Sequence, residues 1–205
     1  MRNGITPLPG GRLRKEYRGT LAWKREITLL RQMAGSGLCP ELLDAPLRQA
    51  AMTECPGVPL GECIRTASRQ EAREMMAALA AWTDAFEREY HRRTGQTAVL
   101  EDLSPGNFLW DAASRKITGL DFEFWHTGSP AESRGGLLCM AERLKAAEIT
   151  GEELTGELYR QFRGGSDRAE LEHRAARARQ QTALRQRAMP LIRQTAGVIL
   201  AGGQS

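Results

Sequence analysis

Two aspartates and an asparagine in the middle of the chain have the types and spacing needed for phosphoryl transfer. Asp102 and Asn107 lie five residues apart in the segment Leu100–Trp110, and Asp121 follows fourteen residues after Asn107, beyond an apolar run. Transfer from ATP needs one carboxylate to orient the attacking hydroxyl and oxygen ligands that hold magnesium across the phosphates. The pattern predicts Asp102 as the catalytic carboxylate, and Asn107 and Asp121 as magnesium ligands.

The segment between the first two of these residues has the composition of a tight turn. Pro105 and Gly106 favour a reversal of the chain that brings Asn107 back toward Asp102. One loop can therefore offer both polar groups to the same small volume.

These residues resemble the catalytic and metal-binding motifs of the protein-kinase-like superfamily. The catalytic loop there reads His-x-Asp-x-x-x-x-Asn, with which Asp102 and Asn107 are in register. The metal-binding strand there ends in Asp-Phe-Gly, where this chain has Asp121-Phe122-Glu123. This form of the motifs is similar to the atypical branches: aminoglycoside and choline phosphotransferases, Rio-type kinases and lipopolysaccharide Kdo kinases. The resemblance covers residues 5–145 and implies that ATP and Mg²⁺ are the cofactors.

The resemblance implies two further catalytic residues near the N-terminus. Kinases hold a strand lysine over the ATP phosphates by pairing it with a helix glutamate. Lys15 lies on an expected strand and Glu26 in the first turns of the next expected helix, so we expect these two to form the pair. The competing lysine, Lys24, falls within the helix. The ordinary alternative is an exposed lysine, with the glutamate paired to a neighbouring basic residue.

The segment Met52–Gly57 falls where these kinases have the hinge between their lobes. By that resemblance, backbone groups around Glu54 and Cys55 would bind the adenine of ATP. An edge strand followed by a turn would give the same local pattern, so this assignment depends on position alone.

The chain departs from typical protein kinases at three places. A short Pro9-Gly10-Gly11 turn stands where a glycine-rich loop would precede Lys15, and Leu100 replaces the loop histidine. No Ala-Pro-Glu segment follows Asp121, which argues against a peptide-docking platform. The expected acceptor is therefore a hydroxyl group of a small molecule, a lipid-linked sugar or an atypical protein substrate.

The elements that must position these residues follow from the hydrophobic pattern. Helices are expected at 21–33, 68–90 and 130–147, with a helical tail from about 151, and strands at 12–17, 39–45, 49–54, within 97–109 and at 117–122. This order predicts an α+β chain with two lobes. With the resemblance, it implies a kinase-like fold with a minimal N-terminal β lobe (1–56) and a helical C-terminal lobe (57–190) that carries the catalytic loop.

Composition and charge narrow the class of protein. Hydrophobic residues make up 41% and charged residues 26% of the 205 residues, as in soluble globular proteins. No apolar run is long enough to span a membrane and no secretory signal is visible, so we expect a cytoplasmic protein with reduced cysteines. The stretch 168–193 is rich in arginine, but no aromatic residue is interleaved to stack bases. A solvated helix face is therefore favoured over a nucleic-acid partner.

The last residues resemble the start of a different kind of domain. Ala196–Ser205 is an apolar run that ends in a glycine turn, similar to the first strand and loop of molybdenum-cofactor-type nucleotidyltransferases. We expect 191–205 to begin a truncated domain of that kind, with an accidental likeness in a short tail as the alternative. A second function follows: a catalytically weak nucleotide-binding module that regulates a fused or partner nucleotidyltransferase.

Overall fold

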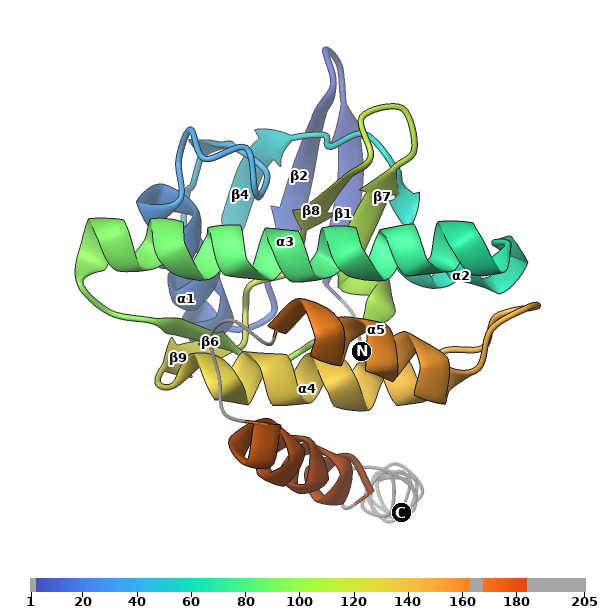
Figure 1. Cartoon of the computed structure of the whole chain (residues 1–205). Coiled ribbons are helices and arrows are strands. Elements are labelled where there is room, and N and C mark those ends of the chain that lie inside the picture. The colour runs from blue at the N-terminus through green and yellow to red at the C-terminus, as the bar shows by residue number, and fades with distance from the viewer. Residues whose placement is uncertain (1–2, 163–167, 184–205) are drawn as a thin grey trace, which may run out of the picture.

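The structure is a computed structural model of the chain, and it describes residues 3–162 and 168–183. A small antiparallel sheet with one helix forms an upper lobe, and a group of helices with two short β ribbons forms a lower one (Figure 1). The predicted α+β class and the two-lobed arrangement are confirmed. The predicted nucleotidyltransferase start at 191–205 lies outside the described residues.

The upper lobe is a four-stranded sheet in which every neighbouring pair is antiparallel. Its order is β1 (Gly4–Leu8), β2 (Arg12–Glu16), β4 (Gln49–Thr53) and β3 (Leu42–Asp44). Gly10 and Gly11 form the turn between β1 and β2, and both have the positive φ that glycine adopts without strain. Lys15 lies on β2, opposite Ala50 of β4, and is therefore held on a strand that is paired on both sides.

Helix α1 (Thr20–Gln32) completes the upper lobe. Its buried face contains Glu26 among the apolar residues Ile27, Leu29 and Leu30. The expected helix at 21–33 is thus present, one residue earlier at each end. A carboxylate on an otherwise apolar face must have a partner in the interior, and the site described below supplies it.

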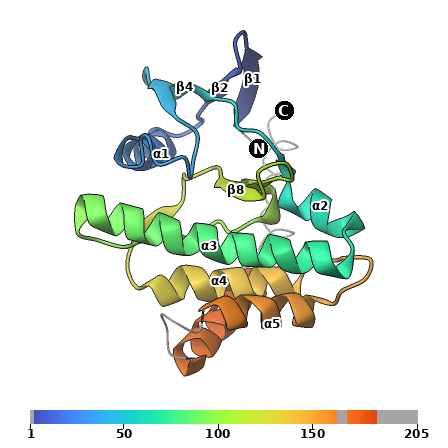
Figure 2. The same cartoon turned by 45° about the horizontal axis from the view of Figure 1, so that its top comes forward.

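The lower lobe contains a long helix that crosses the molecule between the upper sheet and the two helices that follow it in the chain (Figure 2). The lobe comprises α2 (Leu60–Thr66), α3 (Arg69–Thr94), α4 (Pro130–Glu142), α5 (Gly151–Phe162) and a helical segment at 168–183. Helix α3 begins with a capping box between Ser68 and Glu71 and ends at Gly95, whose φ is 71°. The helix continues past the predicted end near residue 90, because its apolar stripe ends before its helical backbone does.

Helix α4 is shorter than the helix expected at 130–147. It ends at Glu142, and the next helix begins with Gly151 packed against the backbone of Glu142: a Cβ on Gly151 would lie 2.2 Å from the Glu142 carbonyl oxygen. The chain must therefore leave the helix early to let α5 fold back. This contact between two helix ends has no signature in the local sequence pattern.

The lower lobe also contains two short β ribbons. One contains β5 (Val58–Pro59), β7 (Phe108–Asp111) and β8 (Lys116–Gly119), and the other pairs β6 (Ala98–Leu100) with β9 (Trp125–Thr127). The strand expected at 117–122 ends at Gly119, because Asp121 has a φ of 60°. That left-handed conformation ends an extended strand and turns the chain toward the upper lobe.

An aromatic cluster joins α3 to the ribbons. The Trp82 ring stacks on Phe86 with centroids 5.0 Å apart, and Phe86 stacks on Phe122 with centroids 5.7 Å apart. Phe122 follows directly after Asp121, so this packing fixes the segment that carries the expected metal ligand. Over the described ranges, no helix has both the length and the apolar character needed to cross a bilayer.

Candidate active site

Lys15 is the centre of a buried charge cluster. Its Nζ lies 2.6 Å from Glu26 Oε2, 2.7 Å from Asp121 Oδ1 and 2.8 Å from Glu123 Oε1. The residue is 6% exposed. The structure thus brings together the strand lysine, the helix glutamate and the distant aspartate that the sequence singled out.

The carboxylates decide the charge of the lysine. Burial by itself lowers the pKa of Lys15, but attraction by Glu26 and then by Asp121 outweighs burial, and the pKa lies above its ordinary value. Lys15 therefore remains an ammonium group at neutral pH. A permanent cation at this point can bind phosphate oxygens.

Glu26 connects the upper lobe to the segment around Asp121. Its Oε2 accepts from Lys15, and its Oε1 accepts a hydrogen bond of 3.2 Å from the backbone N–H of Phe122. Both oxygens of this buried carboxylate are therefore occupied by donors within the protein. Glu26 can hold the lysine in place, but it has little capacity left for a metal ion.

Glu123 also belongs to the cluster, although it is not among the predicted site residues. Its Oε1 contacts Lys15 and also accepts from the Asn3 side-chain amide. Burial raises the pKa of Glu123, and Lys15 opposes that rise. The available signal was an acidic residue two positions after Asp121, where the kinase motif has glycine.

Asp102 and Asn107 meet as the loop composition suggested. The Asn107 side-chain amide donates to the Asp102 carbonyl over 3.0 Å, and a one-turn 3-10 helix, Pro105–Asn107, makes the reversal. The Asn107 carbonyl accepts from the Leu120 N–H at 2.8 Å. The Asp102–Asn107 loop and the strand end that precedes Asp121 are therefore linked directly.

Oxygen donors suited to magnesium are concentrated here. Carboxylate oxygens of Glu26, Asp121 and Glu123 lie within 4.8 Å of one another, but the Lys15 ammonium contacts all three. Since the Lys15 ammonium already occupies the centre of that group, Asp121 is the member best placed for a metal: 40% of its side chain is exposed. An Asp121 carboxylate and the Asn107 amide oxygen are the hard ligands that Mg²⁺ prefers.

The segment expected to bind adenine follows β4 and leads the chain from the sheet to the lower lobe (Figure 2). The Glu54 N–H donates to the Gly11 carbonyl over 2.8 Å. That donor is therefore engaged by the β1–β2 turn, and the adenine prediction is restricted to the Glu54 carbonyl and the backbone groups of Cys55. Cys55 is half-buried, and burial raises the pKa of its thiol.

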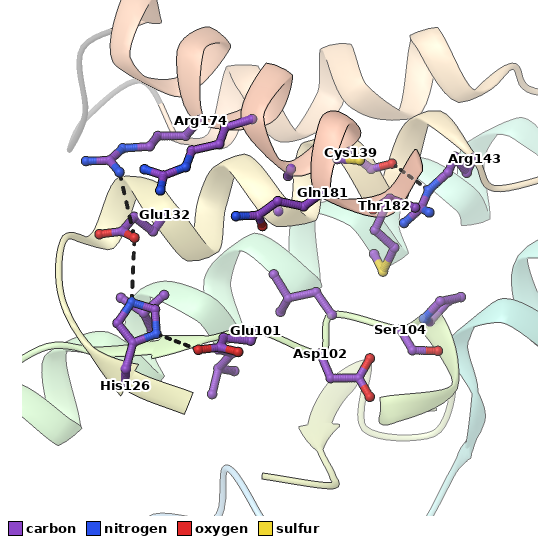
Figure 3. A pocket seen from close by; sticks show the side chains of 18 of the residues that line it. Glu101, Asp102, Ser104, His126, Glu132, Cys139, Arg143, Arg174, Gln181 and Thr182 are labelled. Carbon is purple, nitrogen blue, oxygen red and sulfur yellow. Dashed lines mark hydrogen bonds and ion pairs between the residues drawn. The ribbon is translucent and has the colours of Figure 1, made fainter. Parts of the chain in front are cut away.

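A pocket of about 920 Å³ lies beside the Asp102–Asn107 loop, between α4 and the helical segment 168–183 (Figure 3). Asp102 and Ser104 line it on the loop side. This pocket could not be predicted from the sequence, because its polar lining comes from separate segments. Its polar lining residues include Glu101, Asp102, Ser104, His126, Glu132, Arg143, Arg174 and Arg177.

One wall of this pocket is a chain of charged side chains. His126 Nδ1 lies 2.9 Å from Glu101 Oε1, and its Nε2 lies 3.6 Å from Glu132 Oε2. Arg174 Nη1 lies 3.7 Å from the same Glu132 oxygen. Figure 3 shows these four side chains in sequence along one side of the cavity. Each carboxylate on this wall therefore has a basic neighbour.

Comparison with known proteins relates the chain to others by structure. No protein-family model matches the sequence, and no curated protein sequence matches it either. The streptomycin–ATP complex of APH(2″)-IIa aligns at 10% identity with a TM-score of 0.59, over 85% of this chain and 83% of that one. The ADP-bound aminoglycoside phosphotransferase APH(2″)-Ib aligns at 11% identity with a TM-score of 0.58, over 85% and 81%.

A choline/ethanolamine kinase family protein from Mesorhizobium loti aligns at 16% identity with a TM-score of 0.60, over 83% of this chain and 69% of that one. At such identities the likeness concerns the fold and not the substrate. This chain has a lysine strand and a glutamate helix in a small β lobe, followed by a helical lobe that carries the Asp–Asn loop. The chain has the two-lobed fold of the protein-kinase-like phosphotransferases.

Proposed function

We propose that this protein is an ATP- and Mg²⁺-dependent phosphotransferase that moves the γ-phosphoryl group of ATP to a hydroxyl acceptor. The observation that carries the proposal is the contact of Lys15 with both Glu26 and Asp121, at 2.6 and 2.7 Å. These three residues come from a strand, a helix and a distant strand end. A buried lysine between two carboxylates, next to an Asp–Asn loop, suits phosphate and metal binding better than it suits stability.

Each residue has a defined role in this proposal. Lys15 binds phosphate oxygens, and Glu26 fixes its position through the bond at 2.6 Å. Asn107 and Asp121 hold the magnesium, which neutralises charge on the phosphates. Asp102 orients the acceptor hydroxyl and receives its proton. Because the chemistry is in-line displacement, positioning and charge neutralisation provide most of the rate.

Binding of the nucleotide requires an exchange of partners around Lys15. In this structure the ammonium contacts three carboxylates. Phosphate oxygens would take the places of Asp121 and Glu123, while Glu26 keeps its bond to Lys15. Asp121 would then be released to bind the metal from its exposed side. The adenine would lie against the Glu54 carbonyl and the Cys55 backbone. The ATP and ADP in the two aminoglycoside-enzyme structures support a nucleotide in this fold.

Two aspartate variants test the proposal. Asp121→Asn should abolish the magnesium dependence of ATP binding, because it removes an anionic metal ligand. Asp102→Asn should leave ATP binding within about twofold and lower turnover by about 100-fold or more, as expected for loss of a general base. Asp44→Asn, an exposed aspartate on β3, is the matched control. ATP binding that is unchanged by removal of Mg²⁺ or by Asp121→Asn would contradict the proposal.

A second candidate is a nucleotide-binding module with little activity that regulates a nucleotidyltransferase, fused or separate. The short β1–β2 turn and Leu100, in place of the loop histidine, favour it. The two candidates differ in one measurement. Mg²⁺-dependent ATP binding with no hydrolysis or transfer, in the wild type as in Asp102→Asn, would favour the regulatory module.

A further inference from the structure

We propose that the acceptor is anionic: a hydroxyl compound that also carries a carboxylate or phosphate group, bound in the pocket beside Asp102. This inference depends on the proposed function, and it adds the chemical class of the substrate. Asp102 lines the pocket of about 920 Å³, within the size range of small-molecule sites. A hydroxyl oriented by Asp102 would therefore place the remainder of its molecule in this cavity.

The two carboxylates on one wall of the pocket, Glu101 and Glu132, have contacts within the protein. Glu101 contacts His126 at 2.9 Å, and Glu132 has both His126 and Arg174 within 4 Å, at 3.6 and 3.7 Å. His126 lies between the two carboxylates, and Arg174 contacts Glu132 as well. Neither carboxylate is therefore a free site for a cationic ligand. The wall defines the shape of the pocket more than its charge preference.

Two arginines of the pocket, in contrast to these carboxylates, have no ion-pair partner among the described residues. Arg143 and Arg177 line the same pocket, and over the described ranges neither has a carboxylate within ion-pair distance. Arg143 Nε donates to the Cys139 carbonyl over 3.1 Å, which fixes the guanidinium at the end of α4. Figure 3 shows Arg143 at the same end of the cavity as Ser104, away from the Glu132–Arg174 pair.

A fixed guanidinium is a specific group for anions. It matches carboxylate and phosphate oxygens with two parallel hydrogen bonds. A quaternary ammonium or other cation would need aromatic faces or uncompensated carboxylates. Among the described lining residues there is no Phe, Tyr or Trp. The pocket therefore has a proton acceptor, Asp102, at one point and hydrogen-bond donors that can bind an anion at another.

The test compares four ligands that share a sugar skeleton and differ in charge: glucose, glucosamine, gluconate and glucose 6-phosphate. Binding is measured by calorimetry in the presence of Mg²⁺ and ADP, so that no turnover is needed. We expect gluconate or glucose 6-phosphate to bind at least tenfold more tightly than glucose and glucosamine. The two anions separate a carboxylate preference from a phosphate preference.

The double variant Arg143→Gln, Arg177→Gln should weaken binding of the anion at least tenfold. Arg168→Gln is the matched control, since Arg168 lies on the same helical segment, pairs with Glu172 and is not in the pocket lining. Arg143→Lys keeps the charge but loses the paired donors, and should give an intermediate loss. Circular dichroism and ADP binding verify that the variants are folded.

Three results would overturn the inference: equal or tighter binding of glucosamine or glucose, no binding of either anion at millimolar concentration, or anion binding that the double variant does not weaken. Each of these leaves ADP binding by the wild type intact. Failure of the wild type to bind ADP with Mg²⁺ would instead refute the proposed function itself, so the two failures are distinguishable.

Discussion

Lys15 shows how one side chain can be structural and functional at once. Three carboxylates surround its ammonium group, and two of them, Glu26 and Glu123, are themselves buried. A buried ion pair rarely stabilises a protein as much as an apolar pair of the same size would. Removing one partner is nevertheless costly, because the remaining charges are left without compensation.

Replacement of Lys15 should therefore destabilise the fold as well as remove phosphate binding. We expect Lys15→Met to lower the free energy of unfolding by about 3–5 kcal/mol, the usual cost of breaking a buried pair. Urea unfolding at pH 7 measures this. Lys116→Met, at the exposed start of β8, is the control and should change stability by about 0.5 kcal/mol or less. If the two variants were equally stable, the carboxylate cluster would have to be protonated in the native protein.

Another buried acid, Glu87, lies away from the Lys15 cluster. Burial raises the pKa of Glu87 to about 7, although Arg134 lies 2.7 Å away and lowers it. Between the ordinary value of 4.5 and about 7, folded Glu87 retains a proton that the unfolded chain has released. Folding therefore takes up a proton in this range, and the contribution of Glu87 to stability falls as the pH rises.

Glu87→Gln should remove this pH dependence. The stability of the variant relative to wild type should increase by about 1–3 kcal/mol between pH 4.5 and pH 8, from the relation of about 1.4 kcal/mol per pKa unit. Urea unfolding of both proteins at the two pH values gives the difference directly, with all other titrating groups cancelled. A relative gain by the wild type at pH 8 would mean that attraction by Arg134 outweighs the cost of burial.

At the level of elements, packing of α3 against β8 determines where the Asp121 segment lies. Gly119 ends β8, and a Cβ there would lie 2.3 Å from the Trp82 ring and 3.0 Å from the Phe122 ring. No side chain larger than hydrogen fits without movement of an aromatic ring. The glycine therefore allows the close approach that places Asp121 next to Lys15.

Two glycine-to-alanine substitutions should have opposite effects. Gly119→Ala should destabilise the protein by about 1–3 kcal/mol through overpacking, and should weaken Mg²⁺-dependent nucleotide binding as Asp121 shifts. Gly156→Ala, in α5, meets nothing within 4 Å and should stabilise the protein by about 0.5–1 kcal/mol through helix propensity. Thermal unfolding and nucleotide titration test both. Unimpaired binding in Gly119→Ala would show that the ring moves without displacing Asp121.

The elements that could be predicted are those with a strong local signal. The long helix α3 has both an apolar stripe and a capping box, and α1 has a short stripe bounded by glycine. Helix α2, with seven residues, and strand β9, with three, were not predicted. Strand β9 exists because β6 pairs with it from Ala98 to Leu100. A partner so far away in the sequence leaves no trace in the strand's own residues.

Over the whole molecule, the site is non-local. Lys15 and Asp121 are 106 residues apart and still meet at 2.7 Å. Their meeting could be predicted from the motif resemblance, which contains the long-range geometry, but not from periodicity. No motif resemblance indicated the acceptor pocket. Its wall joins Glu101, His126, Glu132 and Arg174 from four different segments, and no spacing in the sequence relates them.

A nucleotide that contacts both lobes should stabilise the molecule as a unit. With Mg²⁺ and ADP at about 100 times the dissociation constant, linkage adds about 2.7 kcal/mol to the free energy of unfolding, or about 5–10 °C in melting temperature for a chain of this size. We expect this shift in the wild type and in Asp44→Asn.

Removal of the metal with EDTA, or the substitution Asp121→Asn, should eliminate most of that shift. Calorimetry would also show one transition for both lobes, since the lysine cluster and the aromatic contacts of Phe122 join the sheet to the helices. An equal shift with and without metal would place the magnesium outside the Asn107–Asp121 site. Two separate transitions, of which the ligand moved one, would mean that the nucleotide binds to a single lobe, and the exchange of partners around Lys15 would then have no role in binding.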